Sequence, residues 1–220
     1  CSSDLTMLLA LSHKLLAKDR LTRDGRWHEK LNEMGIGLTG RTLGLIGLGN
    51  IGREILRVVA PLEMRTLAFD PFVTPDAARA GGAELRSLDD LLEQSDFVCV
   101  CCALTADTHH LLNRERLARM KPTSLFVNTS RADLFASGVL VDALKKGRPG
   151  FGAVDVYENE PVQNGDHPLL KMSNVICTPH LGYSEKGSYE AIYEGGVEQI
   201  LAYAAGKPIN VLNPEAAGKK

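Results

Sequence analysis

The glycine-rich segment Gly47-Leu48-Gly49-Asn50-Ile51-Gly52 constrains the fold of this 220-residue chain more than any other feature. An apolar run without helical spacing, residues 42–48, leads into it and shares its first two residues. Residues 50–60 then carry helical spacing up to Pro61. Continuous apolar runs of this length are typical of buried strands, and proline ends a helix. The sequence therefore predicts a strand, a tight glycine turn and a helix in immediate succession.

The same alternation continues through the middle of the chain. Further strands are expected at 65–69, 97–104, 124–128, 152–156 and 175–177, and a short unit of 75–80, Gly81-Gly82 and 84–86 lies between the first two of them. Helical patterns are expected at 5–16, from Ser87 onward, and at 114–118, 139–146 and 190–205. This order predicts an α/β fold of the Rossmann type, a doubly wound parallel sheet with helices on both faces. In such a sheet all strands end at one edge, and ligands bind there.

The glycine segment has the context of a dinucleotide-binding loop. It follows a strand, opens a helix, and is followed by an acid, Asp70, at the end of the next strand. Free N–H groups at a helix N-terminus bind phosphates, and the acid accepts bonds from ribose hydroxyls. A carboxylate repels a 2′-phosphate, so we predict NAD as the cofactor. The residues expected to contact it here are Gly47, Gly49, Asn50, Ile51, Gly52 and Asp70.

Three chemically active side chains follow later strands and should share the ligand edge. They are Arg131, Glu160 and His180. Reduction of a 2-oxo acid needs a hydride, a proton for the oxygen and a cation for the carboxylate. Histidine titrates near neutrality and can exchange the proton, a neighbouring carboxylate favours and orients its protonated form, and arginine binds carboxylates in bidentate fashion.

These residues lie in stretches that resemble the D-isomer-specific 2-hydroxyacid dehydrogenases, the family of phosphoglycerate, glycerate and D-lactate dehydrogenases. The matching stretches are 40–52, 69–71, 128–131, 154–161 and 178–182. The resemblance implies that Arg131, Glu160 and His180 are catalytic, with a small 2-hydroxy or 2-oxo acid as substrate. It also implies cofactor contacts from four residues: Thr105, Ser130, Asp155 and His180. Of these, Asp155 would bind the nicotinamide carboxamide.

Two segments depart from the family pattern. Ala103 stands where the family's Pro-Leu-Thr turn has proline, which loosens that turn but leaves Thr105 in place. Residues 135–138, Phe-Ala-Ser-Gly, replace a common acidic Val-Asp-Glu, so the following helix should be less well capped.

The resemblance also predicts how the chain is organised. We expect an NAD-binding domain at residues 1–206, including an N-terminal crossover helix, and a segment at 207–220 that returns toward a largely absent substrate-binding domain. The family dimerises through this domain, so a homodimer is expected. Trp27, in a polar stretch, would then contact the partner; Trp27 packed on its own domain is an equal alternative.

Composition narrows the remaining possibilities. The net charge of −2 gives no electrostatic reason to expect nucleic acid or an anionic membrane as partner. No apolar run is long enough to span a bilayer. The cysteines Cys99, Cys101 and Cys102 lie in an apolar run and lack the spacing of metal ligands, so we expect no metal site and a reducing, cytoplasmic location.

Three other functions compete with an NAD-dependent dehydrogenase. Formate dehydrogenase pairs its histidine with glutamine, which Glu160 argues against. A non-enzymatic NAD-sensing protein of the same fold, like corepressors that keep the catalytic trio, remains open, as does an inactive fragment that only binds NAD.

Overall fold

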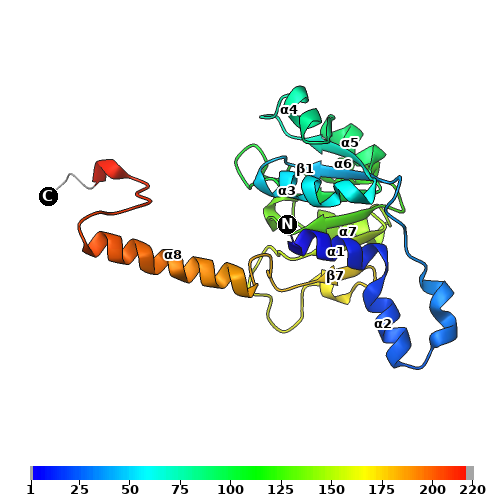
Figure 1. Cartoon of the computed structure of the whole chain (residues 1–220). Helices are drawn as coiled ribbons and strands as arrows, with labels where there is room; N and C mark the ends of the chain where they lie inside the picture. The colour runs from blue at the N-terminus through cyan, green and yellow to red at the C-terminus, as the bar shows by residue number, and fades with distance from the viewer. Residues whose placement is uncertain (1, 217–220) are drawn as a thin grey trace. The chain divides into compact units, whose positions relative to one another are not determined.

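A computed structural model describes residues 2–216 of the chain, which forms two compact units, Cys1–Gly182 and Tyr183–Lys220. The first unit contains a seven-stranded sheet (Figure 1). Its strands are β1 (Thr42–Ile46), β2 (Arg65–Phe69), β3 (Glu84–Leu85), β4 (Phe97–Val100), β5 (Leu125–Asn128), β6 (Phe151–Val154) and β7 (Val175–Cys177).

The strands are ordered β3-β2-β1-β4-β5-β6-β7, and every neighbouring pair is parallel. The strand order reverses direction between β1 and β4, where Leu43 lies opposite Phe97. Ligands of doubly wound sheets bind outside the strand ends at such a reversal. The predicted Rossmann-type parallel sheet is therefore confirmed, with the glycine loop after β1 at this position.

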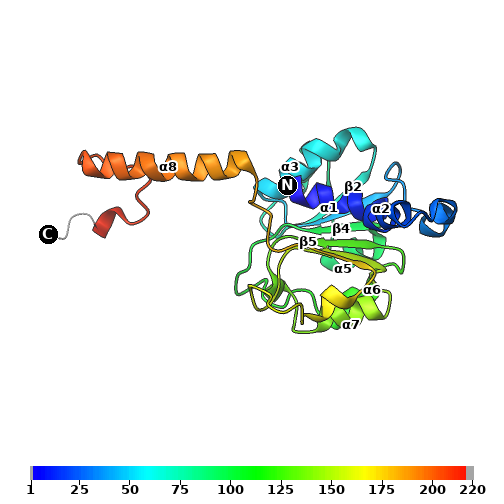
Figure 2. The same ribbon diagram turned by 90° about the horizontal axis from the view of Figure 1, so that it is seen from below.

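Helices cover both faces of the sheet. Successive strand side chains point to opposite faces, so each face is apolar and packs against helices in its own cluster. Leu43, Leu45 and Phe97 contribute to one cluster, together with apolar side chains of α1 (Ser2–Ser12), α3 (Asn50–Val59) and α4 (Pro75–Ala80). Ile46 and Val98 contribute to the other, with α5 (Leu88–Gln94), α6 (Arg114–Arg119) and α7 (Val139–Lys145). Figure 2 shows α1 and α3 on one side of the strands and α5, α6 and α7 on the other.

Side chains cap the starts of three of these helices. Thr74, Ser87 and Asn113 each accept a hydrogen bond from a backbone N–H in the first turn of α4, α5 and α6. The serine cap confirms the start predicted for α5. By contrast, α7 begins at Gly138, which has no side-chain cap, so the prediction of a less well capped helix is also confirmed.

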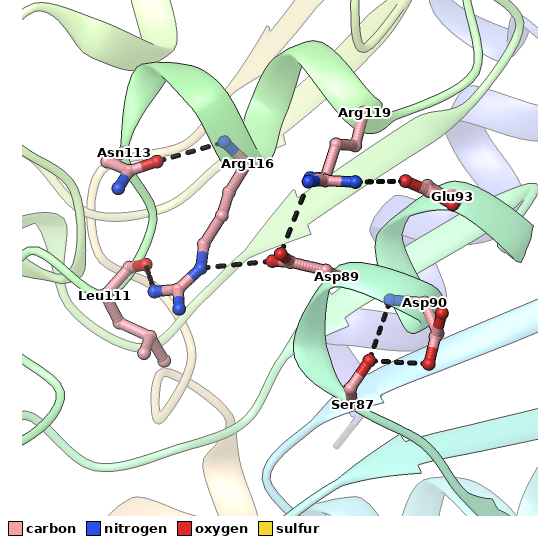
Figure 3. Close-up of polar contacts among 8 residues, drawn as sticks. All are labelled: Ser87, Asp89, Asp90, Glu93, Leu111, Asn113, Arg116 and Arg119. Carbon is pink, nitrogen blue, oxygen red and sulfur yellow. Dashed lines mark hydrogen bonds and ion pairs between the residues drawn. The ribbon is translucent and has the colours of Figure 1, made fainter.

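An ionic network joins α5 to α6 (Figure 3). Asp89 of α5 accepts a hydrogen bond from Arg116 Nε at 3.3 Å, and its other oxygen lies 3.5 Å from Arg119 Nε. Arg119 also pairs with Glu93, and Arg116 Nη1 donates to the carbonyl of Leu111 at 2.6 Å. These side chains are one-third to one-half exposed, so the network adds modestly to the stability supplied by the core.

The N-terminal arm differs from the prediction. The sequence predicts one helix over 5–16 and a polar connection, whereas α1 ends at Ser12 and α2 (Leu15–Arg23) follows after Lys14, whose φ is 49°. The 3-10 helix η1 (Trp27–Glu33) comes next. Within this polar stretch, Arg23 pairs with Asp19 at 2.8 Å, an i,i+4 pair that supports a helix in which no residue is buried.

Four short 3-10 helices and one long helix complete the described structure. The 3-10 helices are η2 (Ala60–Leu62), η3 (Ala132–Leu134), η4 (Pro168–Lys171) and η5 (Pro214–Ala216). The second unit contains α8 (Lys186–Ala204), which begins four residues before its predicted start. Among residues 2–216, no helix is long and apolar enough to cross a bilayer. The predicted boundary at residue 206 stays a prediction, and residues 217–220 of the predicted return segment lie outside the described structure.

Candidate active site

The glycine loop is built so that α3 approaches the end of β1 closely. Gly47 has a φ of +100°, and a Cβ added there would lie 2.7 Å from the backbone nitrogen of Cys102. A Cβ at Gly52 would lie only 2.4 Å from the carbonyl oxygen of Gly47. Gly49, in contrast, faces open space, with nothing within 4 Å of an added Cβ. The loop therefore combines two sterically required glycines with a third whose backbone is accessible.

Asp70 lies beside this loop, at the end of β2. One carboxylate oxygen accepts a hydrogen bond from the backbone N–H of Leu48 at 2.8 Å, and the other accepts from Phe72 N–H at 2.9 Å. The side chain is partly exposed, and the exposed residues Asn50 and Ile51 begin α3 next to it. An open glycine, a helix N-terminus and a neighbouring carboxylate together fit the pyrophosphate and ribose of a dinucleotide.

Arg131 follows β5 in a turn that is organised by a buried amide. Asn128, only 1% exposed, donates from Nδ2 to the carbonyl of Arg131 at 3.1 Å and accepts from Ser130 N–H at 3.0 Å. The hydroxyl of Ser130 donates to the carbonyl of Val100 at the end of the adjacent strand β4. The guanidinium of Arg131 is exposed at this edge of the sheet.

His180 and Glu160 form a direct pair. His180 Nδ1 lies 2.6 Å from Glu160 Oε2, and the second oxygen of Glu160 accepts from Tyr157 N–H at 2.8 Å. Both side chains are about one-third exposed, so the pair is held by the protein yet accessible to a ligand. The two residues come from segments that follow β6 and β7, as the sequence predicts.

The charge of Glu160 is stabilised by its neighbours. Partial burial alone would raise the pKa of this carboxyl, but hydrogen bonds from His180 and from Tyr157 N–H oppose that effect. The positive charge of Arg131 acts in the same direction, and the net pKa of Glu160 lies below its ordinary value. Glu160 is therefore ionised near neutrality and interacts electrostatically with both Arg131 and His180.

Asp155, just after β6, is completely buried. Its carboxylate accepts hydrogen bonds from Thr178 Oγ1, Leu181 N–H and Gly182 N–H at 2.5, 2.7 and 2.8 Å. The structure thus places the predicted site residue Asp155 against the segment that carries His180.

Thr105 lies in an exposed turn after β4 that a second threonine holds together. Thr108 Oγ1 accepts from Thr105 N–H at 2.8 Å and donates to the carbonyl of Ala103 at 2.7 Å. These bonds close the turn in which Ala103 replaces proline. Sequence reasoning missed the roles of Thr108 and Asn128, although threonine and asparagine within turns are known to bond to nearby backbone.

Sequence reasoning also missed a link from the N-terminal helix to the arginine turn. Asp4 of α1, 2% exposed, accepts a hydrogen bond from Thr129 Oγ1 at 2.5 Å. The one signal for this link in the sequence is the acid at position 4, which lies among the apolar residues of the first helix.

The cysteines have the properties of apolar packing residues. Burial raises the pKa of the Cys99 thiol far above its ordinary value and that of Cys102 to about 11, so neither thiol is reactive near neutrality. Within residues 2–216, no three His, Cys, Asp or Glu side chains are grouped so that they could hold a metal ion.

Comparison with known proteins agrees with this geometry. Residues 5–182 match the family described as D-isomer specific 2-hydroxyacid dehydrogenase, NAD binding domain. The chain is 35% identical over 217 residues to the glyoxylate reductase of Thermococcus kodakarensis, covering 96% of this chain and 65% of the relative. It is 36% identical over 210 residues to the D-3-phosphoglycerate dehydrogenase of Archaeoglobus fulgidus, covering 95% of this chain and 40% of that protein.

A solved structure shows the same arrangement in three dimensions. The phosphoglycerate oxidoreductase of Vibrio cholerae superimposes with a TM-score of 0.86 at 34% identity, over 93% of this chain and 66% of that one. This chain thus spans about 65% of the length of the glyoxylate reductases that it matches. Because the family match extends over most of the chain and includes the glycine loop, Arg131, Glu160 and His180, the chain belongs to the D-isomer specific 2-hydroxyacid dehydrogenase family, as its NAD-binding domain.

Proposed function

We propose that the protein carrying this chain transfers a hydride between NAD(H) and a small D-2-hydroxy acid or its 2-oxo acid. The single observation that supports this most is the His180–Glu160 pair, 2.6 Å apart, in which the positive charge of Arg131 helps to lower the pKa of Glu160. A proton donor, a fixed carboxylate and a guanidinium are what reduction of a 2-oxo acid requires. The glycine loop follows a strand at the same edge of the sheet.

The three residues would divide the work as follows. His180 gives a proton to the carbonyl oxygen during reduction and takes it back during oxidation. Glu160 stabilises the protonated imidazole and fixes its orientation. Arg131 binds the substrate carboxylate in bidentate fashion and polarises the neighbouring carbonyl. When NAD is bound, it supplies the hydride acceptor or donor.

The cofactor would lie along the edge formed by the strand ends. Gly49, Asn50, Ile51 and the α3 N-terminus would hold the pyrophosphate, while Gly47 and Gly52 keep loop and helix close. Asp70 would accept bonds from the adenosine ribose. Further contacts are proposed from the residues after the later strands: Thr105, Ser130, Asp155 and His180.

The activity is tested by mixing the protein with NADH and a panel of 2-oxo acids that begins with glyoxylate, since relatives at about 35% identity bear that name. We expect absorbance at the NADH band to fall with at least one acid. The His180→Ala variant should lose turnover but keep most of its NADH affinity, because the glycine loop and Asp70 would supply the main cofactor contacts. If NADH binds but no acid is reduced by any longer form of the protein, the dehydrogenase proposal is wrong.

We also propose a homodimer joined through the N-terminal arm. Trp27, Leu31 and Met34 are each about two-thirds exposed, a cluster of apolar side chains that a monomer would leave in water. The alternative in which Trp27 packs on its own domain does not match this exposure. Light scattering should give a dimer mass for the wild type and a monomer mass for Trp27→Asp; a monomeric wild type would contradict the proposal.

A cytoplasmic location is proposed on chemical grounds. Cys99, Cys101, Cys102 and Cys177 are all free thiols in the structure, which suits a reducing compartment.

A further inference from the structure

Glu160 lies in a long loop that regular structure does not fix. Strand β6 ends at Val154 and η4 begins at Pro168, so residues 155–167 form neither helix nor strand. Residues 158–161 and 163–166 of this loop are exposed, so the apolar core does not hold them. Long loops that keep one shape are held by contacts of their own side chains. The position of Glu160 therefore depends on bonds made within this loop or at its ends.

His167 forms a second histidine–carboxylate pair, inside the loop itself. Its Nε2 lies 3.0 Å from Glu158 Oε2, and its Nδ1 accepts a hydrogen bond from the N–H of buried Leu169 at 3.3 Å. Since Nδ1 is an acceptor, the proton of the neutral imidazole lies on Nε2 and is donated to Glu158. The His167 side chain, 16% exposed, thus joins the start of the loop to the first turn of η4.

Tyr157 connects this second pair to the pair of the candidate site. Its ring meets the His167 ring edge to face, with centroids 5.1 Å apart and planes at 73°. Its backbone N–H donates to Glu160 Oε1 at 2.8 Å, and its hydroxyl donates to the carbonyl of Thr178 at 3.0 Å. Burial raises the pKa of the Tyr157 phenol well above its ordinary value, so the hydroxyl keeps its proton and remains a donor. A displacement of the Tyr157 ring would therefore displace Glu160.

The two histidine–carboxylate pairs use opposite ring nitrogens. His180 faces Glu160 with Nδ1, so the neutral His180 imidazole that donates to Glu160 carries its proton there. In water, a neutral histidine carries its proton mainly on Nε2. The Nδ1–H form of His180 therefore depends on Glu160 being in place, and the tautomer of His180 reports the geometry of the pair.

We propose that His167 is a positioning residue for the candidate site. Through its bond to Glu158 and its ring contact with Tyr157, it holds residues 157–160 where Glu160 meets His180. Both ring nitrogens of His167 are bonded within the chain, so it acts through Glu160 and not on the substrate. The inference deepens the proposed function and rests on it for the effect on turnover alone.

Two substitutions separate the bonds of His167. In His167→Asn the side-chain oxygen can replace Nδ1 and keep the bond from Leu169 N–H, but no group reaches Glu158. In His167→Gln the amide nitrogen can replace Nε2 and keep the bond to Glu158. The matched control is His13→Asn, because His13 is exposed in the connection between α1 and α2.

The readout is the tautomer of His180. Each protein is isotope-labelled on the histidine nitrogens, and NMR correlations between ring nitrogens and ring protons identify the protonated nitrogen at mildly basic pH. The signals of His180 are assigned by their loss in His180→Ala. Calorimetry confirms that each variant is folded.

In the wild type we expect the Nδ1–H form at His180 and the Nε2–H form at His167. In His167→Asn, His180 should shift toward the Nε2–H form, and turnover, where the protein shows it, should fall about 10- to 100-fold. His167→Gln should shift His180 less, and His13→Asn should leave it unchanged. A wild-type His180 tautomer in folded His167→Asn would overturn the proposal and leave His167 as the cap of η4 alone. A shift as large in His167→Gln would overturn the role given to Glu158.

A third variant covers the case in which neither His167 variant folds. Glu158→Ala breaks the same pair from its more exposed end, where the side chain is 36% exposed. Its His180 should shift in the same direction, and a folded Glu158→Ala protein with the wild-type tautomer would refute the proposal. Because the NMR measurement needs neither cofactor nor substrate, absence of dehydrogenase activity would contradict the proposed function without affecting this result.

Discussion

Replacing the second and third glycines of the loop by alanine should separate packing from cofactor binding. In Gly52→Ala the new Cβ would lie 2.4 Å from the Gly47 carbonyl oxygen, whereas ordinary contacts begin at 3.4 Å. The start of α3 must therefore move by about 1 Å, and overpacking of this kind costs about 1–3 kcal/mol. For a unit of this size, the Tm should fall by about 2–12 °C.

Gly49→Ala is the matched comparison. Its φ of −75° suits alanine, and an added Cβ meets nothing within 4 Å. Alanine is less favourable than glycine at the start of a helix, which destabilises the fold, but it also lowers the entropy of the unfolded chain, which stabilises the fold. The two effects nearly cancel, so the free energy of unfolding should change by less than about 1 kcal/mol. The methyl group would nevertheless occupy the space where we place the pyrophosphate.

Calorimetry and NADH fluorescence titration check the two effects separately. We expect both variants to bind NADH about 10- to 100-fold more weakly, which corresponds to the loss of one charge-assisted hydrogen bond. Only Gly52→Ala should unfold at a lower temperature. Wild-type NADH affinity in Gly49→Ala would refute the placement of the phosphates, and an unchanged Tm in Gly52→Ala would refute the steric argument.

Two other variants test the charged groups of the site. The pKa of Glu160 is lowered in the folded state, so its charge stabilises the fold above the unfolded pKa of about 4.5, and this contribution is lost as the pH falls through the folded pKa. In Glu160→Gln, the free energy of unfolding measured with urea should therefore fall less between neutral and acidic pH than in the wild type. An identical pH profile of stability would contradict the pairing with His180. Asp70→Asn removes the carboxylate that would repel a 2′-phosphate, so the preference for NADH over NADPH in fluorescence binding should narrow; an unchanged preference would mean that Asp70 is not at the ribose.

Much of the fold follows from local sequence patterns. The strands at 65–69 and 175–177 match their predictions because short apolar runs between turn residues leave few alternatives. The strand predicted over 42–48 ends two residues earlier, at Ile46, where the glycine turn begins. The strand predicted at 97–104 ends at Val100 instead. There the chain passes over Gly47, and an apolar run alone does not show where a distant loop will interrupt it.

The sequence indicated which residues form the candidate site, but not the hydrogen bonds that hold those residues in place. Arg131, Glu160 and His180 follow strands, so parallel topology brings them to one edge. The buried side chains that hold their turns, Asn128 and Asp155, depend on hydrogen bonds between segments far apart in the chain. Such bonds leave no periodic pattern in the sequence, which is why their donors could not be named in advance.

The all-parallel order of the sheet has a consequence for how the protein folds. Its central strands β1 and β4 are not joined by a hairpin, and the hydrogen bond between Thr42 and Asp96 links residues 54 positions apart. Loop closure over such distances must occur before the contacts that reward it form, which slows folding. The glycine loop after β1 contacts the segment around Cys102 after β4, so this part of the site requires the two strands to be paired. A bound dinucleotide should therefore slow unfolding, and it should accelerate folding only to the extent that the transition state already contains this pairing.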